Sequence, residues 1–426
     1  MASAEALGTV VVGAGVTGLA AAMGTGAVVL EAAPEPGGIC SSYYVRPGTT
    51  ERLAHRPADG DAYRFEVGGG HWIFGGDPEV LDLIDALAPM EQHERRAEVH
   101  FASTGACVPY PVQDHLGSLD PALAERAATE DRPALPTDRA PTMAEWLRHR
   151  FGATACDRFF DPFHERYTAG LYRQLAPQDA YKTPQGSAGP KGYNVTFRYP
   201  SAGLDVVARA MAARSTVRYD HRVVAIDPTA RTIEVAGRGT IAYERLICTL
   251  PLDATLELCG VDPARTGPPD PATSVVVVNI GGERGDGCPD SHWVYEPEAA
   301  AGFHRYGVYS NVDRSFVPGG RADRVALYVE HARRRGDRPD PAAEAALVAA
   351  MVDELVARDV VRSVDVVDVS WVPTAYTWSV PGSTWVADAL AVLDELGVEQ
   401  VGRYARWHFQ GIAESIAEGL AVGAVP

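Results

Sequence analysis

The sequence of 426 residues predicts an α/β protein that opens with a Rossmann-like dinucleotide-binding unit. The first observation is an apolar, largely β-branched run at residues 9–12, which is typical of a buried strand and leads directly into a glycine-rich turn. The second is a helical stretch at 19–23, interrupted by Gly24, with an apolar strand at 28–30 after it. The third is a composition with 46% hydrophobic and 22% charged residues, which indicates a folded globular chain.

The turn at residues 13–18 has the pattern G-x-G-x-x-G, and each glycine has its own steric task. Gly13 permits the tight turn, Gly15 lets the backbone approach a pyrophosphate, and Gly18 allows the helix to pack closely on the strand. The helix start offers free N–H groups and positive partial charge to the phosphates. Glu31, at the end of the second strand, is placed to bind a ribose hydroxyl pair. The cofactor-binding residues predicted in this unit are Gly13, Gly15, Val16, Thr17, Gly18 and Glu31.

Two further glycine clusters indicate which dinucleotide binds. The pair at 37–38, followed by Ser41, lets a second backbone segment approach the same cofactor, and three glycines at 68–70 precede His71. A planar ring packed against backbone requires such a run. These features resemble the FAD-binding flavoproteins of the amine oxidase and UDP-galactopyranose mutase superfamily rather than nicotinamide dehydrogenases. The FAD-binding residues predicted here are Gly37, Gly38, Ser41, Gly69, Gly70 and His71.

Five separated segments, in the same order along the chain, resemble the eukaryotic-type UDP-galactopyranose mutases. They are residues 69–74, 108–113, 196–200, 303–311 together with Tyr295, and 402–407. The resemblance implies that Arg198 and Arg305 bind a diphosphate, and planar guanidinium groups do suit phosphate oxygens. It also implies that these two arginines and His71 are the catalytic residues. The substrate-binding residues it implies are Tyr110, Gln113, His164, Arg198, Tyr295, Arg305, Tyr376 and Phe409, and its further FAD contacts are Val223, Gly402 and Arg403.

The resemblance further implies how the chain is divided into domains. The FAD-binding domain is discontinuous and consists of residues 1–78, 201–270 and 396–426. Residues 79–200 form a helical region that binds substrate or nucleotide, and residues 271–395 supply an antiparallel sheet, so the substrate domain is mixed α+β. Strands of that sheet are expected at 275–280, 308–310, 324–329 and 364–372, and a last helix at 412–422.

The sugar side of the site departs from the mutase pattern. His164 stands where the family has an asparagine that contacts the uridine, Val312 and Phe409 replace tyrosines, and Ala413 replaces another asparagine. With fewer hydroxyl and amide groups, the pocket leaves buried hydroxyls of a substrate without partners. The sequence therefore predicts a sugar that is less hydroxylated than galactose or differently substituted.

Two enzymatic functions fit these residues. The first is a mutase that acts on a nucleoside-diphosphate sugar, for which the resemblance implies non-covalently bound FAD, active when reduced, with flavin N5 as the nucleophile. The second is an FAD-dependent oxidoreductase that oxidises an alcohol or amine in sugar or natural-product biosynthesis. An apolar slot beside the flavin is enough for the second function.

Simpler interpretations of the same residues stay open. Arg198 and Arg305 are also compatible with surface ion pairs, because the protein has surplus acid. Tyr110 and Tyr295 also suit an ordinary core, and His71 also suits a histidine that bonds to backbone after a glycine turn.

Charge and composition exclude several other classes of function. A net charge of −18, from 38 basic and 56 acidic residues, disfavours nucleic acid, so the predicted partner is a small molecule. Apolar stretches are short and no basic leader precedes the first strand, which predicts a cytoplasmic protein without membrane contact. The 6 cysteines form no C-x-x-C pair, so no metal site is expected. The only lysines are Lys182 and Lys191, which disfavours Schiff-base chemistry, and the oligomeric state stays open, a homo-oligomer included.

Overall fold

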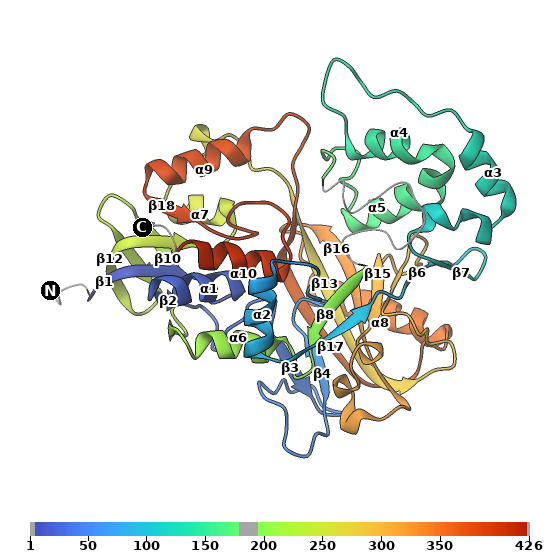
Figure 1. Cartoon of the computed structure of the whole chain (residues 1–426), viewed down its shortest axis with the longest axis horizontal. Coiled ribbons are helices and arrows are strands. Elements are labelled where there is room, and N and C mark those ends of the chain that lie inside the picture. Colours follow the sequence, from blue (N-terminus) through green and yellow to red (C-terminus); the bar gives the residue numbers. More distant parts are fainter. Residues whose placement is uncertain (1–4, 179–194, 424–426) are drawn as a thin grey trace.

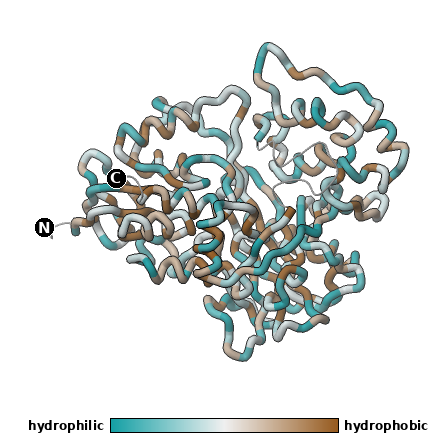
Figure 2. The backbone as a smooth tube through the Cα atoms, in the orientation of Figure 1, coloured by the Kyte–Doolittle hydropathy of each residue, from teal (hydrophilic) through white to brown (hydrophobic). Residues whose placement is uncertain are grey.

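The computed structural model describes residues 5–178 and 195–423, and within them it contains two seven-stranded sheets (Figure 1). Lys182 and Lys191 lie outside the described residues. Hydrophobic residues follow the strands through the interior, whereas hydrophilic residues concentrate in the connecting loops (Figure 2). The α/β fold class predicted from the sequence is confirmed.

The first sheet has a parallel centre formed around the start of the chain. Its first strand pairs in parallel with β2 on one side and β12 on the other, and β10 and β11 add an antiparallel hairpin beyond β12. The strands come from three separated stretches of the chain. They are β1 (Glu5–Val12), β2 (Val28–Leu30), β9 (Thr216–Arg218), β10 (Val223–Asp227), β11 (Thr232–Val235), β12 (Gly239–Cys248) and β18 (Val398–Gln400).

Two helices from opposite ends of the chain, α1 (Val16–Thr25) and α10 (Ile412–Ala421), pack along each other beside this sheet (Figure 1). Small residues permit the close approach, since a Cβ added to Gly419 would lie 2.4 Å from the carbonyl oxygen of Thr17. A Cβ added to Gly24 would lie 3.1 Å from the Leu420 carbonyl oxygen. Helix α1 continues through Gly24, so the interruption expected there is wrong: packing against α10 outweighs the low helix propensity of glycine. The other helices near this sheet are α2 (Pro78–Leu87), α6 (Leu204–Ala212), α7 (Leu252–Leu258) and α9 (Trp385–Glu395).

The second sheet is built around one strongly apolar strand, β13 (Ala272–Arg284). Helix α8 (Pro341–Ala357) covers one of its faces through Met351 and Leu355. A two-stranded sheet of β3 (Ser42–Val45) and β4 (Tyr63–Glu66) lies against the other face. The remaining strands are β6 (Ala97–Phe101), β7 (Ala106–Pro109), β14 (Trp293–Tyr295), β15 (Arg305–Val308), β16 (Arg324–Arg334) and β17 (Val361–Thr377).

One expected strand of this sheet is displaced. The pattern at 308–310 predicts a strand, but the strand ends at Val308 and Tyr309–Asn311 form a 3-10 turn. The side chain of Tyr309 explains the change, because its ring stacks on Phe316 at 4.7 Å and its hydroxyl donates to Asn279 at 3.0 Å. These buried contacts draw the backbone away from the ladder.

Residues 121–167 contribute a helical lobe, seen at the upper right of Figure 1. It contains α3 (Pro121–Thr129), α4 (Met143–Ala155) and α5 (Asp161–Tyr167), with a π-helical turn at Cys156–Phe160 between the last two. A separate apolar core that includes Phe151, Phe160 and Tyr172 holds the lobe together. Helix α5 contacts β16, so the lobe faces one end of the second sheet. A small sheet of β5 (Met90–Glu94) and β8 (Thr196–Pro200) pairs the chain segments that precede and follow the lobe.

Candidate active site between the glycine loops and the second sheet

The turn between β1 and α1 has the geometry of a pyrophosphate cradle. Gly13 has a φ of +102° and donates its N–H to the Leu30 carbonyl at 2.9 Å, which ties the turn to β2. A Cβ at Gly18 would lie 2.0 Å from the Gly13 carbonyl oxygen, so only glycine lets the helix pack here. At Gly15, in contrast, a Cβ would meet nothing within 4 Å. That open space lies at the N-terminus of α1, where free N–H groups suit an anion.

The second glycine pair closes over the same turn. Gly37 donates its N–H to the Ala14 carbonyl at 2.8 Å, and a Cβ at Gly38 would lie 3.6 Å from the Gly15 Cα. Glu31 accepts hydrogen bonds from the N–H groups of Ala14 and Ala33, each at 2.7 Å. Its carboxylate therefore lies beside the turn, with further lone pairs for a ribose hydroxyl. These residues fit the dinucleotide that the sequence predicts.

Other predicted FAD residues lie around this cradle. A Cβ at Gly402 would lie 2.6 Å from the Thr17 side chain, and the Gly402 N–H donates to Glu418 at 3.1 Å. Ser41 donates to the Pro36 carbonyl at 2.6 Å, which stabilises the loop that carries Gly37 and Gly38. Val16 is the first residue of α1 and Val223 the first of β10.

The loop that carries three glycines lies flat on the second sheet. Gly69 has a φ of +81°, and a Cβ on it would lie 3.0 Å from a Glu330 carboxylate oxygen. A Cβ at Gly70 would lie 2.1 Å from the Tyr328 hydroxyl oxygen. Buried Asn279 donates to the carbonyl of Glu66 at 3.2 Å, just before this loop begins. The sheet therefore fixes the loop in position, with His71 at its end.

His71 is a neutral imidazole at neutral pH. Burial and the nearby positive charge of Arg403 lower its pKa to about 4. Its Nδ1 lies 3.3 Å from the Gly69 carbonyl oxygen, so one ring nitrogen contacts backbone. The side chain also lines a cavity beside the loop, so the backbone contact and a role toward a ligand are compatible.

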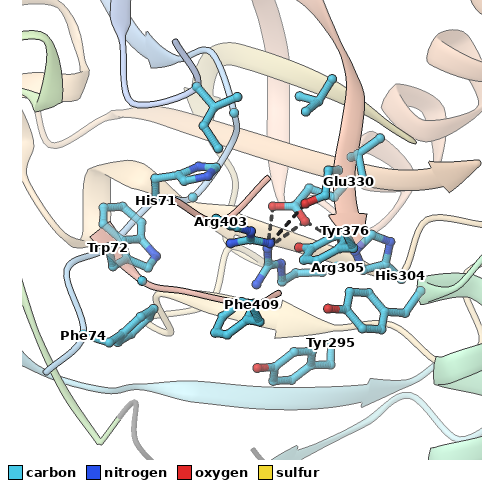
Figure 3. Close-up of a pocket in the computed structure, with 18 of the residues that line it drawn as sticks. His71, Trp72, Phe74, Tyr295, His304, Arg305, Glu330, Tyr376, Arg403 and Phe409 are labelled. Carbon is cyan, nitrogen blue, oxygen red and sulfur yellow. Dashed lines mark hydrogen bonds and ion pairs between the residues drawn. The ribbon is translucent and has the colours of Figure 1, made fainter. Parts of the chain in front are cut away.

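This cavity, of about 230 Å³, opens between the glycine loop, the second sheet and the helical lobe (Figure 3). It brings together many of the side chains that the sequence assigns to the site from distant segments. Those that line it are Gly70, His71, Tyr110, His164, Tyr295, Arg305, Tyr376, Arg403 and Phe409. Arg403 donates to the carbonyl oxygens of Ala375 at 3.0 Å and Gln410 at 3.2 Å, and its guanidinium lies 4.6 Å from the centre of the Phe409 ring.

Aromatic rings form most of the wall that faces the helical lobe. Tyr110 and Tyr295 lie 4.8 Å apart between ring centres, and Phe163 meets Tyr295 edge-on at 5.3 Å. Tyr167 meets Tyr376 in the same manner at 4.8 Å. Phe163 and Tyr167 are not among the predicted site residues, although the spacing of Phe159, Phe163 and Tyr167 places them on one face of a helix. Burial lowers the pKa of His164 to about 4, and its Nδ1 lies 2.7 Å from the Phe160 carbonyl oxygen.

A buried ion pair lies at the centre of the cavity (Figure 3). One terminal nitrogen of Arg305 donates to both carboxylate oxygens of Glu330 at 2.6 Å, because the two residues are direct partners in the β15–β16 ladder. His304 places its Nε2 3.3 Å from Glu330. Burial opposes ionisation of Glu330, but the charge of Arg305 outweighs it and lowers the carboxyl pKa to about 2. Glu330 is not a predicted site residue either, and its one signal in the sequence is a lone acid after the apolar run 325–329.

Some predicted residues lie elsewhere. Arg198 is on β8, where its backbone exchanges two hydrogen bonds with Ile73, and its side chain is not part of the cavity lining. Gln113 is also outside that lining, in a 3-10 turn after β7. Val312 and Ala413 are buried in the core and do not line the cavity either. Of the four positions where the sequence departs from the mutase pattern, only His164 and Phe409 line the cavity. A diphosphate clamp of Arg198 with Arg305 stays a prediction.

Beneath the glycine loop lies a second buried carboxyl group, Glu66. It accepts hydrogen bonds from the hydroxyls of Ser42, at 2.9 Å, and Tyr199, and it is fully buried. Burial raises the pKa of Glu66 to about 7, although Arg64 opposes the shift.

We expect this carboxyl group to make the protein less stable as the pH rises from about 4.5 to about 7. The unfolded chain releases the proton near pH 4.5 and the folded chain only near pH 7, so the folded state is favoured below this window and loses that advantage across it. The loss amounts to roughly 3 kcal/mol. Glu66→Gln should remove this part of the pH dependence, measured by denaturant unfolding at several pH values. A variant with the same pH profile as the parent would contradict the assignment.

The described residues carry neither a metal-binding cluster nor a membrane-spanning helix. Among residues 5–178 and 195–423, no three His, Cys, Asp or Glu side chains are grouped to hold a metal ion. Within the same described ranges, no helix combines the length and the apolar character needed to cross a bilayer.

Comparison with known proteins agrees with this geometry. The family described as "Flavin containing amine oxidoreductase" matches residues 16–420, so the chain belongs to that family and a flavin cofactor is implied. No curated protein sequence gives a significant match. The superfamily predicted from the glycine clusters is confirmed.

Three solved structures illustrate the shared fold. A reduced UDP-galactopyranose mutase has a TM-score of 0.82 and 20% identity, covering 98% of this chain and 94% of that one. A putative protoporphyrinogen oxidase from Exiguobacterium sp. 255-15 has a TM-score of 0.70 and 16% identity, covering 100% and 98%. Cyclohexylamine oxidase from Brevibacterium oxydans IH-35A has a TM-score of 0.64 and 16% identity, covering 98% of both chains. At these identities the likeness shows the fold alone.

Proposed function

We propose that this member of the flavin containing amine oxidoreductase family is a mutase-type enzyme that acts on a nucleoside-diphosphate sugar. FAD is its non-covalent cofactor, and the enzyme is active with the flavin in its reduced form. When bound and reduced, the flavin supplies the nucleophile for a reaction with no net oxidation. The tasks left to the protein are to position the sugar and to stabilise charge on the diphosphate that departs.

The observation that supports the proposal is the order of groups across one cavity. In Figure 3, His71 lies at one side, Arg403 and Arg305 lie in the middle, and Tyr295 lies at the far side, where its ring is 4.8 Å from that of Tyr110. Tyr295 and Arg305 are direct partners in the β14–β15 ladder, so one sheet face presents both side chains. Aromatic rings offer a stacking surface for a base, and a guanidinium suits the phosphates next to it. A nucleotide sugar has these parts in the same order.

The residues of the cavity suggest what each would do. Only one terminal nitrogen of Arg305 bonds to Glu330 and the side chain is 22% exposed, so the other terminal nitrogen can donate to a phosphate oxygen. Neutral His71 can exchange a hydrogen bond with the flavin side of the site. Phe409 offers no hydroxyl to the sugar, which favours a substrate with fewer hydroxyl groups than galactose. The likeness to a reduced UDP-galactopyranose mutase gives this proposal further support.

The test is a binding and turnover experiment on dithionite-reduced protein. We expect UDP or another nucleoside diphosphate to bind the reduced enzyme more tightly than the oxidised one, as followed by the flavin spectrum. UDP-galactopyranose should be converted poorly to the furanose, and a deoxy analogue should react better, because each buried hydroxyl without a partner costs roughly 1–3 kcal/mol. Efficient interconversion of the two UDP-galactose forms would contradict the altered-sugar part of the proposal. Absence of nucleotide binding in both redox states would contradict the mutase function itself.

A second function is favoured by the apolar part of the same cavity. Phe159, Phe160, Phe163 and Phe409 line it, and an oxidoreductase needs little more than an apolar slot that places an alcohol or amine carbon at the flavin. Anaerobic mixing of the oxidised protein with candidate alcohols and amines tests this function. Bleaching of the flavin by such a compound, without nucleotide binding, would favour the oxidoreductase.

A further inference from the structure

Among the described residues that line the cavity, Glu330 is the one that carries a carboxylate. Its oxygens hold Arg305 on one side, and on the other side an oxygen lies 3.0 Å from the position of a Cβ on Gly69. The side chain is 2% exposed, and it is ionised because the charge of Arg305 holds its pKa well below the usual range. A full negative charge therefore lies between the flavin loop and the guanidinium that the proposal assigns to the phosphates.

The ion pair with Glu330 occupies only some of the N–H groups of Arg305. Both bonds to Glu330 come from a single terminal nitrogen, and the Arg305 side chain is 22% exposed, which leaves the other terminal nitrogen accessible. Guanidinium carries five N–H groups in a fixed plane, so Glu330 both orients the plane and leaves donors for a ligand. His304, 1% exposed, adds an imidazole whose Nδ1 lacks a hydrogen bond within the described part of the chain.

We propose that Glu330 is a specificity-determining residue that makes the cavity favour a diphosphate diester, such as a nucleoside-diphosphate sugar, over a free nucleoside diphosphate. This inference rests on the proposed function. A free nucleoside diphosphate ends in a phosphate monoester with a second pKa near 6, so at pH 8 it carries one more negative charge than the diester. The Glu330 carboxylate repels that additional charge, while Arg305 still offers its N–H groups to either ligand.

The size of the effect follows from Coulomb interaction in a partly buried site. The repulsion between Glu330 and a ligand grows in proportion to the ligand's charge. Removal of the Glu330 charge should therefore raise a ligand's affinity by about three- to fivefold more for each negative charge that it carries beyond those of the ligand it is compared with. The affinity for the diester should rise least, and the affinities for UDP and for inorganic pyrophosphate, which carry about the same charge at pH 8, should rise more. The carboxylate also lies beside the flavin loop, so its removal should raise the flavin midpoint potential.

The test compares the holoenzyme with its Glu330→Gln variant at pH 8. Glutamine keeps the shape of the side chain and an oxygen that accepts from Arg305. Dissociation constants are measured for UDP-galactose, UDP and inorganic pyrophosphate, together with FAD content, melting temperature and midpoint potential. We expect the preference for UDP-galactose over UDP to fall about three- to fivefold and the potential to become more positive.

The chain offers a closely matched control in Glu296. It is buried, it pairs with Arg358 at 2.8 Å and with His100 at 3.0 Å, and it is not part of the cavity lining. Glu296→Gln removes the same charge from the same kind of pair, so it should leave the three affinities and the potential unchanged. If Glu330→Gln loses FAD, the double variant Arg305→Gln/Glu330→Gln replaces it, because both charges of the pair are then removed together. In this double variant, the dissociation constants should depend on the net charge of the ligand about as they do in the parent.

The outcomes separate this inference from the proposed function. Equal gains for UDP-galactose and UDP would overturn the selectivity role of Glu330 and leave the mutase proposal intact. A second outcome is that neither nucleotide binds the parent, while Glu330→Gln binds pyrophosphate more tightly and has a higher flavin midpoint potential. This result would overturn the nucleotide function and support the charge role of Glu330. Unchanged pyrophosphate affinity and potential would overturn the inference outright.

Discussion

Gly15→Val should give a folded but colourless protein. The glycine has a φ of −67° and a ψ of 171°, which valine adopts without strain, and no atom lies within 4 Å of the added Cβ. The side chain would instead fill the space in front of the α1 N-terminus, where the pyrophosphate of FAD is predicted to lie. We expect essentially complete loss of flavin absorbance with far-UV circular dichroism close to that of the parent apoprotein.

Gly8→Val is a suitable control for this variant. Gly8 lies on β1, in the same sheet, and is exposed, and an added Cβ would meet only a Glu244 oxygen at 4.0 Å. This variant should stay yellow. A folded Gly15→Val protein with full flavin content would show that the cofactor does not cross this turn.

Arg305→Met should strongly destabilise the protein. It leaves the Glu330 carboxylate buried at 2% exposure without its cation, and removal of one partner from a buried ion pair costs roughly 3–5 kcal/mol. Adding Glu330→Gln to the same chain should recover most of that loss, because the uncompensated charge is gone. Thermal unfolding of the single and double variants measures the difference.

Arg358→Met separates stability from ligand binding in this prediction. Arg358 pairs with buried Glu296 at 2.8 Å and has the same 22% side-chain exposure as Arg305. We expect a similar drop in melting temperature for both single variants, but weaker nucleotide binding for Arg305→Met alone. An Arg305→Met protein as stable as the parent would show that Glu330 finds another partner or is protonated.

The sequence predicts the cofactor cradle well because the information there is local. Gly13 has a φ of +102°, which favours glycine, and a Cβ at Gly18 would lie 2.0 Å from the Gly13 carbonyl oxygen, so both requirements arise within the turn itself. The aromatic wall combines residues from distant segments of the chain. Even so, the spacing of Phe159, Phe163 and Tyr167 predicts that these three lie on the same face of a helix. The superfamily could therefore be predicted from patterns of a few residues.

The central ion pair could not be predicted in the same way. Arg305 and Glu330 meet because of the register between β15 and β16, and register depends on packing across the whole sheet rather than on nearby residues. The same limit applies to Arg198, whose strand pairs with β5 and directs its side chain outside the cavity lining. Resemblance supplied a plausible role for each arginine, but not the partner that each one has in the fold.

The packing of α10 on α1 has a consequence for the biosynthesis of the protein. Thr17, at the cofactor turn, is contacted by the segments at Gly402 and Gly419, which are synthesised long after the turn. The first strand and its turn are made early but have to wait for these partners, so the cradle forms through contacts of very long sequence separation. A nascent chain arrested before residue 412 should therefore bind no FAD, even though every glycine of the turn has emerged.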